Sequence, residues 1–279
     1  MAIETTCTGR VVVRGRRTRD PVEGEKLLLD VLRNKWPNGT RLKFLITPGG
    51  FVVAPFPAKW HGGVSWNSRP TDLDALRVHA EPVLWRTVTD RVLRAAEGKI
   101  KVLTVGIDLE DDDHSEFAEL VAVCEVATRR VSWTGRSYPR IDDEDQSLVQ
   151  VVDLRTHLLR LANERVLVLG CNDLNMFSPR GWACQSPRGE RRSRCKDMRK
   201  RARKFNPTIV LHHPHCTDTP SIWKNPWAGL LHELPEVKSW ASGIGYYNLW
   251  GECLGAPLQD VLSATRGGTS CIDFVVKPG

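Results

Sequence analysis

Short apolar runs alternate with longer amphipathic stretches along this chain. The short runs, such as Leu42–Ile46 and Arg165–Leu169, have the length of buried strands, which usually span about four to eight residues. The longer stretches, such as Glu23–Asn34, place apolar residues three and four positions apart, as a helix that buries one face does. An alternation of this kind predicts the α/β class.

The same pattern, with proline as a boundary signal, places the individual elements. Pro82 and Pro226 are assigned to first helical turns, where the N–H that proline lacks is not needed. No internal repeat or low-complexity linker interrupts the pattern, so residues 1–279 are expected to form a single domain. The predicted strands are Arg10–Val13, Leu42–Ile46, Val102–Ile107, Ala118–Val126, Arg130–Trp133, Val149–Leu154, Arg165–Leu169, Thr208–Leu211, Ser242–Tyr247 and Ser270–Val275, and the predicted helices are Glu23–Asn34, Pro82–Glu97, Arg191–Lys204 and Pro226–Val237.

Composition places the chain among ordinary globular proteins, with 41% hydrophobic and 26% charged residues. No segment has the features of a secretory signal, and the longest apolar runs are too short to span a bilayer. We therefore expect a cytoplasmic protein that does not bind membranes. Its eight cysteines include no CxxC pair and are expected to remain reduced, and Cys124 has the sequence context of a core residue.

Positive charge is concentrated in one segment. Between Arg188 and Lys204, ten Lys or Arg residues face only two acidic residues, a net charge of +8, whereas the whole chain has +7. Beyond Met198 and Ala202 the segment has almost no apolar stripe, so we expect a helix that does not pack deeply. Such a helix either attracts nucleic acid or an acidic protein partner, or is simply a solvated face.

The nucleic-acid interpretation makes a prediction about individual side chains. We expect Arg191, Arg192, Arg199 and Arg203 to face solvent and to contact phosphates or an acidic surface. The candidate nucleic-acid-binding residues are Arg188, Arg191, Arg192, Arg194, Arg199, Lys200 and Arg203.

Several motifs occur in an order that resembles a known superfamily. They include RLKFLITPGGFV, KIKVLTVGIDLE, RVLVLGCNDLNMF, FNPTIVLHHPH, SGIGYYNLWG and RGGTSCIDF. In this order they resemble the nitrilase (carbon–nitrogen hydrolase) superfamily over roughly residues 10–275. The resemblance implies a four-layer α/β/β/α sandwich.

The resemblance also implies a chemistry, and this chain departs from it. In that superfamily a Cys attacks an amide or nitrile carbon, a Glu acts as general base and a Lys supports the tetrahedral intermediate. Cys171 and Asp173 match the Cys and the Asp of the strand–turn motif, but the Glu position falls on Gly49 and the Lys position falls near Arg136. Glycine cannot transfer a proton, and the planar guanidinium of Arg is not equivalent to an ammonium group.

Histidines close to the predicted site could compensate for the missing base. His213 and His215 follow the strand Thr208–Leu211, and their period-two spacing points them to one side. They could serve Cys171 as a base, could bind zinc together with Cys216 and the Cys171 thiolate, or could be inert loop residues. The candidate catalytic residues are Cys171, His213, His215, Arg136 and Asp173, with no cofactor or metal assigned and zinc binding left open.

Two functions are consistent with these observations. One is a divergent nitrilase-like domain whose degenerate pocket serves as a binding or assembly module with a cationic face. The resemblance implies that relatives of this kind occur with reverse transcriptases in antiviral (phage) defence and that copies of the chain can form homo-oligomers. The other is an active hydrolase in which His213 or His215 supports Cys171 and Arg136 stabilises charge.

A third function class shares the same layering. In the metal-dependent nuclease and phosphatase fold, LVLGCND would correspond to a Gly-Asp-containing motif, with His157 upstream. Cys171 and Asn172 would then replace the Gly-Asp step, and no early Glu ligand is found. We therefore retain this class only as an alternative.

Overall fold

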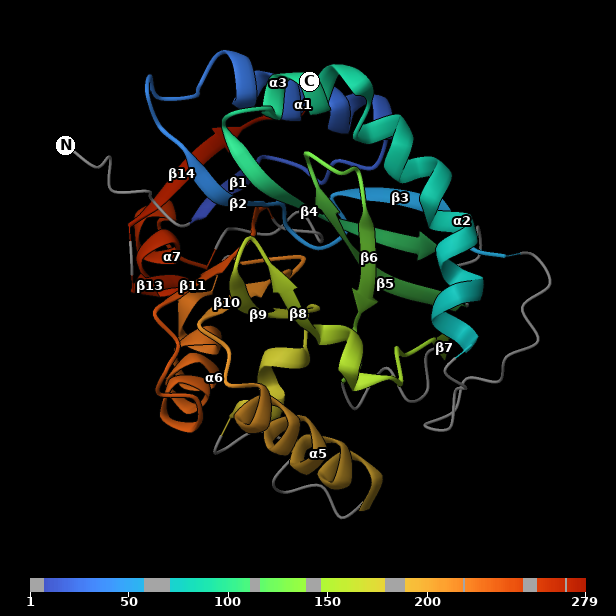
Figure 1. Ribbon diagram of the computed structural model, residues 1–279, viewed down its shortest axis with the longest axis vertical. Helices are drawn as coiled ribbons and strands as arrows, with labels where there is room; N and C mark the ends of the chain where they lie inside the picture. Colours follow the sequence, from blue (N-terminus) through green and yellow to red (C-terminus); the bar gives the residue numbers. More distant parts are fainter. Residues whose placement is uncertain are drawn as a thin grey trace.

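Two β-sheets lie face to face in the centre of the molecule (Figure 1). The computed structural model describes residues 8–57, 71–110, 116–138, 147–178, 189–217, 219–247, 255–268 and 270–279. The nine-stranded sheet has the order β12-β1-β2-β4-β5-β6, with β14, β3 and β7 paired to β1, β4 and β5, and the five-stranded sheet has the order β13-β11-β10-β9-β8. The mixture of parallel and antiparallel pairs is that of an α/β sandwich.

The strands of each sheet come from distant parts of the sequence. The larger sheet contains β1 (Thr8–Arg14), β2 (Leu42–Ile46), β3 (Val52–Pro55), β4 (Ile100–Glu110), β5 (Glu116–Glu125), β6 (Val131–Gly135), β7 (Ser147–Leu148), β12 (Ile244–Tyr246) and β14 (Cys271–Val276). The smaller sheet contains β8 (Leu158–Leu161), β9 (Glu164–Leu169), β10 (Ile209–His212), β11 (Ser239–Ser242) and β13 (Arg266–Gly268).

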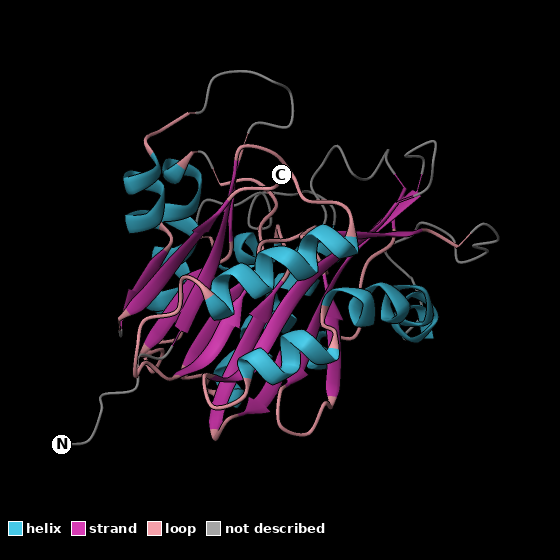
Figure 2. Cartoon of the chain, turned by 90° about the horizontal axis from the view of Figure 1, so that it is seen from above, coloured by secondary structure: helices cyan, strands magenta, loops and turns pink. Residues whose placement is uncertain are grey.

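Helices cover the outer face of each sheet. One side carries α1 (Pro21–Arg33), α2 (Thr71–Thr87) and α3 (Asp90–Ala96), and the other carries α5 (Gly189–Phe205) and α6 (Pro220–Glu233). In Figure 1 the first group lies at the top and right and the second at the bottom, and Figure 2 shows helices running along the strands they cover. A short helix, α7 (Leu258–Ala264), packs beside β12. The predicted α/β/β/α sandwich is therefore confirmed.

Three apolar layers hold the sandwich together. The layer between the sheets contains alternate residues of facing strands, such as Val121 and Val123 on β5 and Val166 and Val168 on β9. The remaining positions of these strands face the helices, which is the period-two pattern of a strand buried on both sides. The same alternation determines which polar side chains point between the sheets.

Some predicted elements were wrong in detail. Val149–Leu154 is not a strand, because its N–H groups make only isolated hydrogen bonds, from Val149 to Phe117 and from Val151 to Arg136. Its apolar side chains are buried without a β-ladder, and an apolar run alone does not distinguish these cases. Within the described residues, no helix is both long and apolar enough to cross a membrane.

Both prolines that were expected to begin helices lie inside them. Pro82 lies within α2, and the predicted helix from Pro82 onward is in fact divided into α2 and α3, with Thr89 capping the latter. Pro226 lies within α6, whose first turn contains Pro220 instead. Packing of an apolar face outweighs the backbone hydrogen bond that an internal proline removes.

Candidate active site

The carboxyl ends of neighbouring parallel strands bring the predicted site residues together. Strands β9 and β10 pair in parallel, with Leu169 opposite His212. The chain continues from β9 into Gly170 and Cys171, and from β10 into His213 and the residues that follow it. The two segments therefore leave the smaller sheet side by side at one edge.

His212 fixes the backbone at Cys171. Its Nε2–H donates to the carbonyl oxygen of Cys171 at 2.8 Å, and its Nδ1 accepts from the Ser242 hydroxyl at 3.0 Å. Burial lowers the pKa of His212 to about 4, so the ring is neutral at physiological pH, in agreement with this pattern of one donor and one acceptor. The Cys171 side chain itself is half-buried.

Two carboxylates from the larger sheet face the same region. Asp108 on β4 and Glu119 on β5 are direct partners in the antiparallel register, so their side chains lie on one face. That face is the inter-sheet face, since Val102 and Val121, which have the same parity as Asp108 and Glu119, belong to the layer between the sheets. Both strands thus place an acidic group between the sheets near the edge of the sandwich.

His215 connects these carboxylates to the thiol. Its Nε2–H donates to both oxygens of Asp108, at 2.8 and 2.9 Å, and its Nδ1 lies 3.7 Å from Glu119 Oε2. A ring nitrogen of His215, the Sγ atom of Cys171 and a carboxylate oxygen of Glu119 all lie within 4.8 Å of one another. Thiol, imidazole and carboxylate therefore form one cluster, which we call the Cys171 cluster.

Two arginines balance the acidic groups. Arg17 forms an ion pair with Asp108 and another with Glu110 at 2.9 Å, and Arg136 donates to Glu119 Oε1 at 2.7 Å. Burial disfavours the charged form of His215, but the facing carboxylates of Asp108 and Glu119 raise its pKa well above the usual value. Burial also opposes ionisation of Asp108, yet His215 and Arg17 keep its pKa below the usual range. His215 is thus an imidazolium at neutral pH.

Two glycines leave room for the histidine ring. A Cβ atom on Gly49 would lie 2.5 Å from the carbonyl oxygen of His213 and 3.2 Å from the His215 ring. A Cβ on Gly50, whose φ is +54°, would lie 2.5 Å from Asp108 Oδ2 and 2.9 Å from the His215 ring. The position at which the resemblance expects a Glu therefore lies against the ring of His215, with no space for a side chain.

The structure brings three of the five candidate catalytic residues into contact with the cluster. Cys171 and His215 belong to it, and Arg136 is bonded to Glu119. Cys171 therefore lies within reach of His215, as predicted. His213 is not part of the cluster, because β10 ends at His212 and the period-two spacing does not extend beyond the strand. It is buried, and burial together with nearby His212 lowers its pKa to about 3.

Asp173 has a different place from the one predicted. It is fully buried, and its Oδ1 accepts from the backbone N–H groups of Ser137 and Tyr138 at 2.8 Å, while its Oδ2 accepts from that of Gly170 at 2.9 Å. These bonds join the segment after β6 to the turn that carries Cys171. Asp173 is therefore a brace for the site, with its oxygens directed at backbone groups.

Asp108 and Glu119 were missed by the sequence analysis. The signal was present as period-two alternation: in IKVLTVGIDLE the polar or small positions Thr104, Gly106 and Asp108 share a face, and in EFAELVAVCE Glu119 shares a face with Val121. An acidic residue on the buried face of an apolar strand needs a partner, which makes it a candidate for a site.

The basic helix α5 packs more deeply than predicted. Cys195, Met198 and Ala202 are buried in the apolar layer beneath it. The prediction that Arg191 faces solvent is wrong, since it is 1% exposed, and Arg199 is half-buried and donates to the Met176 carbonyl at 2.7 Å. A stripe of three small or flexible residues at i, i+3 and i+7 is enough for packing because arginine stems also cover apolar surface.

The other basic side chains of α5 have varied surroundings. Arg194 donates to the carbonyl of Ser137 at 3.0 Å, whereas Arg203 is exposed and forms an ion pair with Glu233. Arg192 and Lys200 are exposed as well, and Arg188 lies outside the described residues.

The residues that suggested a nuclease do not form a metal site. His157 is fully buried, with Nδ1 2.7 Å from the Val168 carbonyl oxygen and Nε2 2.8 Å from the Ser137 hydroxyl. Among the described residues, the one group of three metal-ligating side chains close together is the Cys171 cluster, which contains neither Asn172 nor His157. The nuclease alternative therefore has no support from the site.

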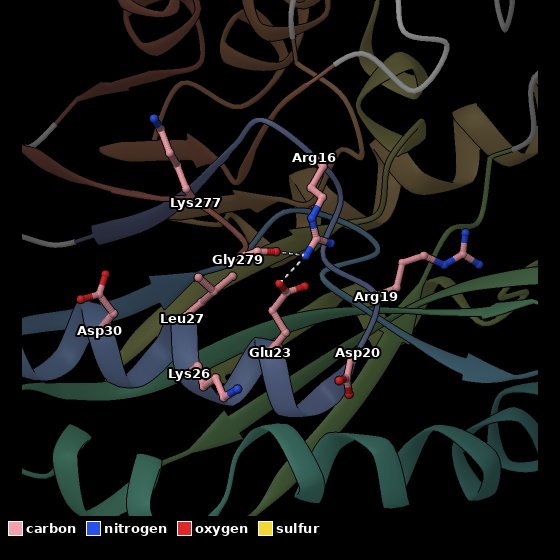
Figure 3. Close-up of a pocket in the computed structure, with 9 residues that line it drawn as sticks. All are labelled: Arg16, Arg19, Asp20, Glu23, Lys26, Leu27, Asp30, Lys277 and Gly279. Carbon is pink, nitrogen blue, oxygen red and sulfur yellow. Dashed lines mark hydrogen bonds and ion pairs between the residues drawn. The ribbon is translucent and has the colours of Figure 1, made fainter.

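A surface cavity of about 630 Å³ lies along α1 (Figure 3). Charged side chains dominate its lining, and an ion pair joins Arg16 and Glu23 at 2.6 Å. It contains none of the Cys171 cluster, no thiol and no histidine. We assign no chemistry to it, and the Cys171 cluster remains the candidate active site.

Comparison with known proteins gives the following likenesses. No protein-family model matches the chain, and no curated protein sequence matches it. Solved structures of the amidase from Nesterenkonia AN1, described as belonging to the nitrilase superfamily, are similar to it. A mutant of that amidase has 13% identity and a TM-score of 0.48, covering 89% of this chain and 81% of its own. A double mutant in complex with acrylamide has 12% identity and a TM-score of 0.49, covering 88% and 79%.

The fold is defined by the sheets and helices themselves. With the cluster in place, the chain is an α/β/β/α sandwich protein with a Cys–His–Asp arrangement at the carboxyl edge of its strands. It is similar to nitrilase-superfamily amidase structures.

Proposed function

We propose that this chain is a divergent nitrilase-superfamily member that hydrolyses carbon–nitrogen bonds with Cys171 as nucleophile. The observation that carries the proposal is the position of His215. Its ring donates to Asp108, lies close to Cys171 within the cluster, and occupies the space beside Gly49. An imidazole there can do the work of the missing Glu, which is to move a proton between the thiol and the substrate.

Each residue then has a defined role. The imidazolium of His215 stabilises a Cys171 thiolate, which attacks the amide carbon and forms a tetrahedral intermediate. When the C–N bond breaks, His215 gives its proton to the leaving amine, and a thioester remains on Cys171. Water then attacks the thioester and gives a proton to His215, which releases the carboxylic acid. Asp108 orients His215, and Arg136 supplies positive charge beside Glu119.

The proposal is tested by trapping the thioester. Incubation of the full chain with short amides and activated esters should add one acyl group, which peptide mass spectrometry places on Cys171. Cys171→Ala should abolish the adduct and turnover, and His215→Asn should lower turnover by at least about 100-fold. The matched control is Cys216→Ser, since Cys216 adjoins His215 in the sequence and its thiol donates to the Tyr247 carbonyl. Acylation at Cys216, or turnover that survives Cys171→Ala, would refute the proposal.

Thiol reactivity provides a test that needs no substrate. Burial raises the pKa of Cys124 to about 11, and this thiol is fully buried. Iodoacetamide should therefore label half-buried Cys171 at least about tenfold faster than Cys124. Equal rates would remove the basis for an activated thiol.

A second function, nucleic-acid binding by α5, is supported by one specific feature. Arg192, Lys196, Lys200 and Lys204 are exposed, have no ion-pair partner within the described structure, and follow one another at four-residue intervals. Four helical residues rise about 6 Å, so the four charges form a ridge along one side of the helix. A ridge of this kind attracts a phosphate backbone.

Salt dependence tests the ridge. Wild-type binding to single-stranded or double-stranded nucleic acid should weaken by roughly one power of salt concentration per phosphate neutralised. Replacing all four ridge residues with Ser should abolish it, while the same change at four exposed cations elsewhere (Arg33, Lys35, Arg91 and Arg94) should not. Binding that is lost equally in both variants, or is absent in the wild type, would contradict this function.

A further inference from the structure

Glu119 is the member of the Cys171 cluster that the thiol mechanism does not use. Its side chain is 11% exposed, and Arg136 donates to Oε1. Oε2 is buried and accepts no hydrogen bond from the described residues, and His215 Nδ1, at 3.7 Å, is beyond hydrogen-bonding distance. A buried carboxylate oxygen without a donor is costly, so its position between the thiol and the imidazole calls for an explanation.

The distances in the cluster match those around a tetrahedral metal ion. Atoms bound about 2.0 to 2.3 Å from zinc lie roughly 3.3 to 3.7 Å from each other. Glu119 Oε2 and His215 Nδ1 are 3.7 Å apart, and Cys171 completes a set in which all donor atoms lie within 4.8 Å. Contraction of the remaining distances, which are at most 4.8 Å, would let the three atoms share one ion.

The partners of the three donors are those of a metal site. His215 donates its other ring N–H to Asp108, which directs Nδ1 toward Glu119 and is the usual second bond of a metal-ligating histidine. Arg136 holds Glu119 through Oε1 and leaves Oε2 directed at the cluster. Asp108 is in turn held by Arg17. Two of the three donors, His215 and Glu119, are therefore oriented before any ion arrives.

We propose that Cys171, His215 and Glu119 bind Zn²⁺, which displaces the Nδ1 proton of His215 to solvent, and that the bound ion blocks Cys171 as a nucleophile. Thiolate and imidazole favour zinc over magnesium or calcium, which prefer oxygen ligands, and three protein ligands leave the fourth position to water. The electron pair that the thiolate shares with zinc is not free to attack carbon. The metal site stands by itself, whereas the block rests on the proposed hydrolase function.

Cobalt binding tests the metal site without substrate. Co²⁺ added to the full wild-type chain should give an intense thiolate-to-cobalt absorption band, which Zn²⁺ then displaces. Cys171→Ser should lose the band, and Glu119→Gln should weaken Zn²⁺ binding by at least about tenfold. Cys216→Ser should keep both, because Cys216 lies outside the donor set. A band that persists in Cys171→Ser, or an unchanged affinity in Glu119→Gln, would overturn the site.

Labelling of the wild-type protein avoids any question of misfolded variants. Zn²⁺ should slow alkylation of Cys171 by at least about tenfold, a chelator should restore it, and alkylation of Cys216 should not change. If neither cobalt nor zinc affects Cys171, the metal proposal fails, and Cys171-dependent turnover would then stand alone. If the cobalt band is present but no turnover appears after chelation, the metal site stands and the hydrolase function fails.

Discussion

Gly49 and Gly50 determine what the Cys171 cluster can contain. In the resemblance that the sequence suggests, this position carries a glutamate. Here the His215 ring lies against both glycines, at 3.2 Å from a Cβ on Gly49 and 2.9 Å from a Cβ on Gly50. A side chain at Gly49 or Gly50 and the His215 ring in its present place therefore exclude each other. Restoring a Glu at Gly49 would displace His215 and would not regenerate the family's site.

Gly49→Ala tests this close packing. The added Cβ would meet a backbone oxygen of His213 at 2.5 Å, so the backbone must shift. We expect the free energy of unfolding to fall by about 1–3 kcal/mol. Any Cys171-dependent turnover should fall as well. The control is Gly98→Ala, where the Cβ meets nothing within 4 Å and only the positive φ of 73° opposes it. Urea denaturation of both variants measures the change in the free energy of unfolding. If Gly98→Ala lowers turnover as much, the contact with His215 is not the cause.

The buried histidines beside the site make stability depend on pH. Burial lowers the pKa of His212 to about 4 and that of His213 to about 3, whereas both titrate near 6.5 in the unfolded chain. The unfolded state therefore binds protons that the folded state does not. Neither histidine lowers the free energy of unfolding above pH 6.5, and both lower it increasingly as the pH falls below that value. Each histidine contributes a slope of about 1.4 kcal/mol per pH unit below pH 6.

Free energies of unfolding between pH 7.5 and pH 5 check this slope. His213→Asn should reduce it by about 1.4 kcal/mol per pH unit, whatever the variant's absolute stability. His215, whose raised pKa makes its contribution change above pH 6.5, is present in both proteins, so its contribution cancels in the difference between their slopes. An identical slope in wild type and variant would show that His213 is protonated in the folded protein.

Among the elements, α5 combines a cationic surface with an apolar underside. Met198 is fully buried between α5 and the smaller sheet, while Lys200, two residues later, is exposed. Met198→Ala should therefore destabilise the fold by about 2–5 kcal/mol through the lost contacts and the cavity. Lys200→Ala should stay within about 0.5 kcal/mol of the wild type. Chemical denaturation measures both, and a similar small effect for both would mean that α5 is only loosely attached.

The sequence predicted helices and strands best where a single pattern of apolar residues determined which positions are buried. Leu42–Ile46 was predicted with its observed ends, because every residue except Lys43 is apolar and buried, as in a strand that packs on both faces. Val149–Leu154 looked the same but is a buried loop, since hydrogen bonding to a neighbouring strand is decided by tertiary structure. The short strand β3 (Val52–Pro55) was missed because the glycines before it and the prolines after it indicated a loop.

At the scale of the whole molecule, the candidate site is assembled from both sheets. Cys171 and His215 follow strands of the smaller sheet, and both could be proposed from the sequence because they stand at the ends of apolar runs. Asp108 and Glu119 lie within strands of the larger sheet. Their proximity to Cys171 depends on how the two sheets face each other, which local patterns do not encode. The imidazolium–carboxylate contact is thus a property of the assembled sandwich.

Arg10 also connects segments that are far apart in the sequence. It is fully buried on β1, forms an ion pair with Asp273 on β14, and donates to the hydroxyl of Thr265 at 2.7 Å and the carbonyl of Leu262 at 2.6 Å. One side chain thereby joins the first strand to α7 and the last strand. A buried guanidinium with this many partners is a strong constraint on the fold.

Arg10→Met tests whether this guanidinium holds the last segments in place. The methionine fills much of the volume but removes the donor that Arg10 supplies to the buried Thr265 hydroxyl and to the Leu262 carbonyl, and Asp273 loses one of its two arginine partners and keeps Arg266 at 2.7 Å. We expect the free energy of unfolding to fall by about 3–5 kcal/mol. Hydrogen exchange should accelerate first in α7 and β14, because they lose their link to β1.

Arg14→Met, at the exposed end of the same strand, is the control and should change stability by less than about 0.5 kcal/mol. If Arg10→Met costs no more than this control, the two ends of the chain are joined by the β1–β14 ladder alone, whose backbone pairing from Thr8 to Val13 is untouched by the substitution.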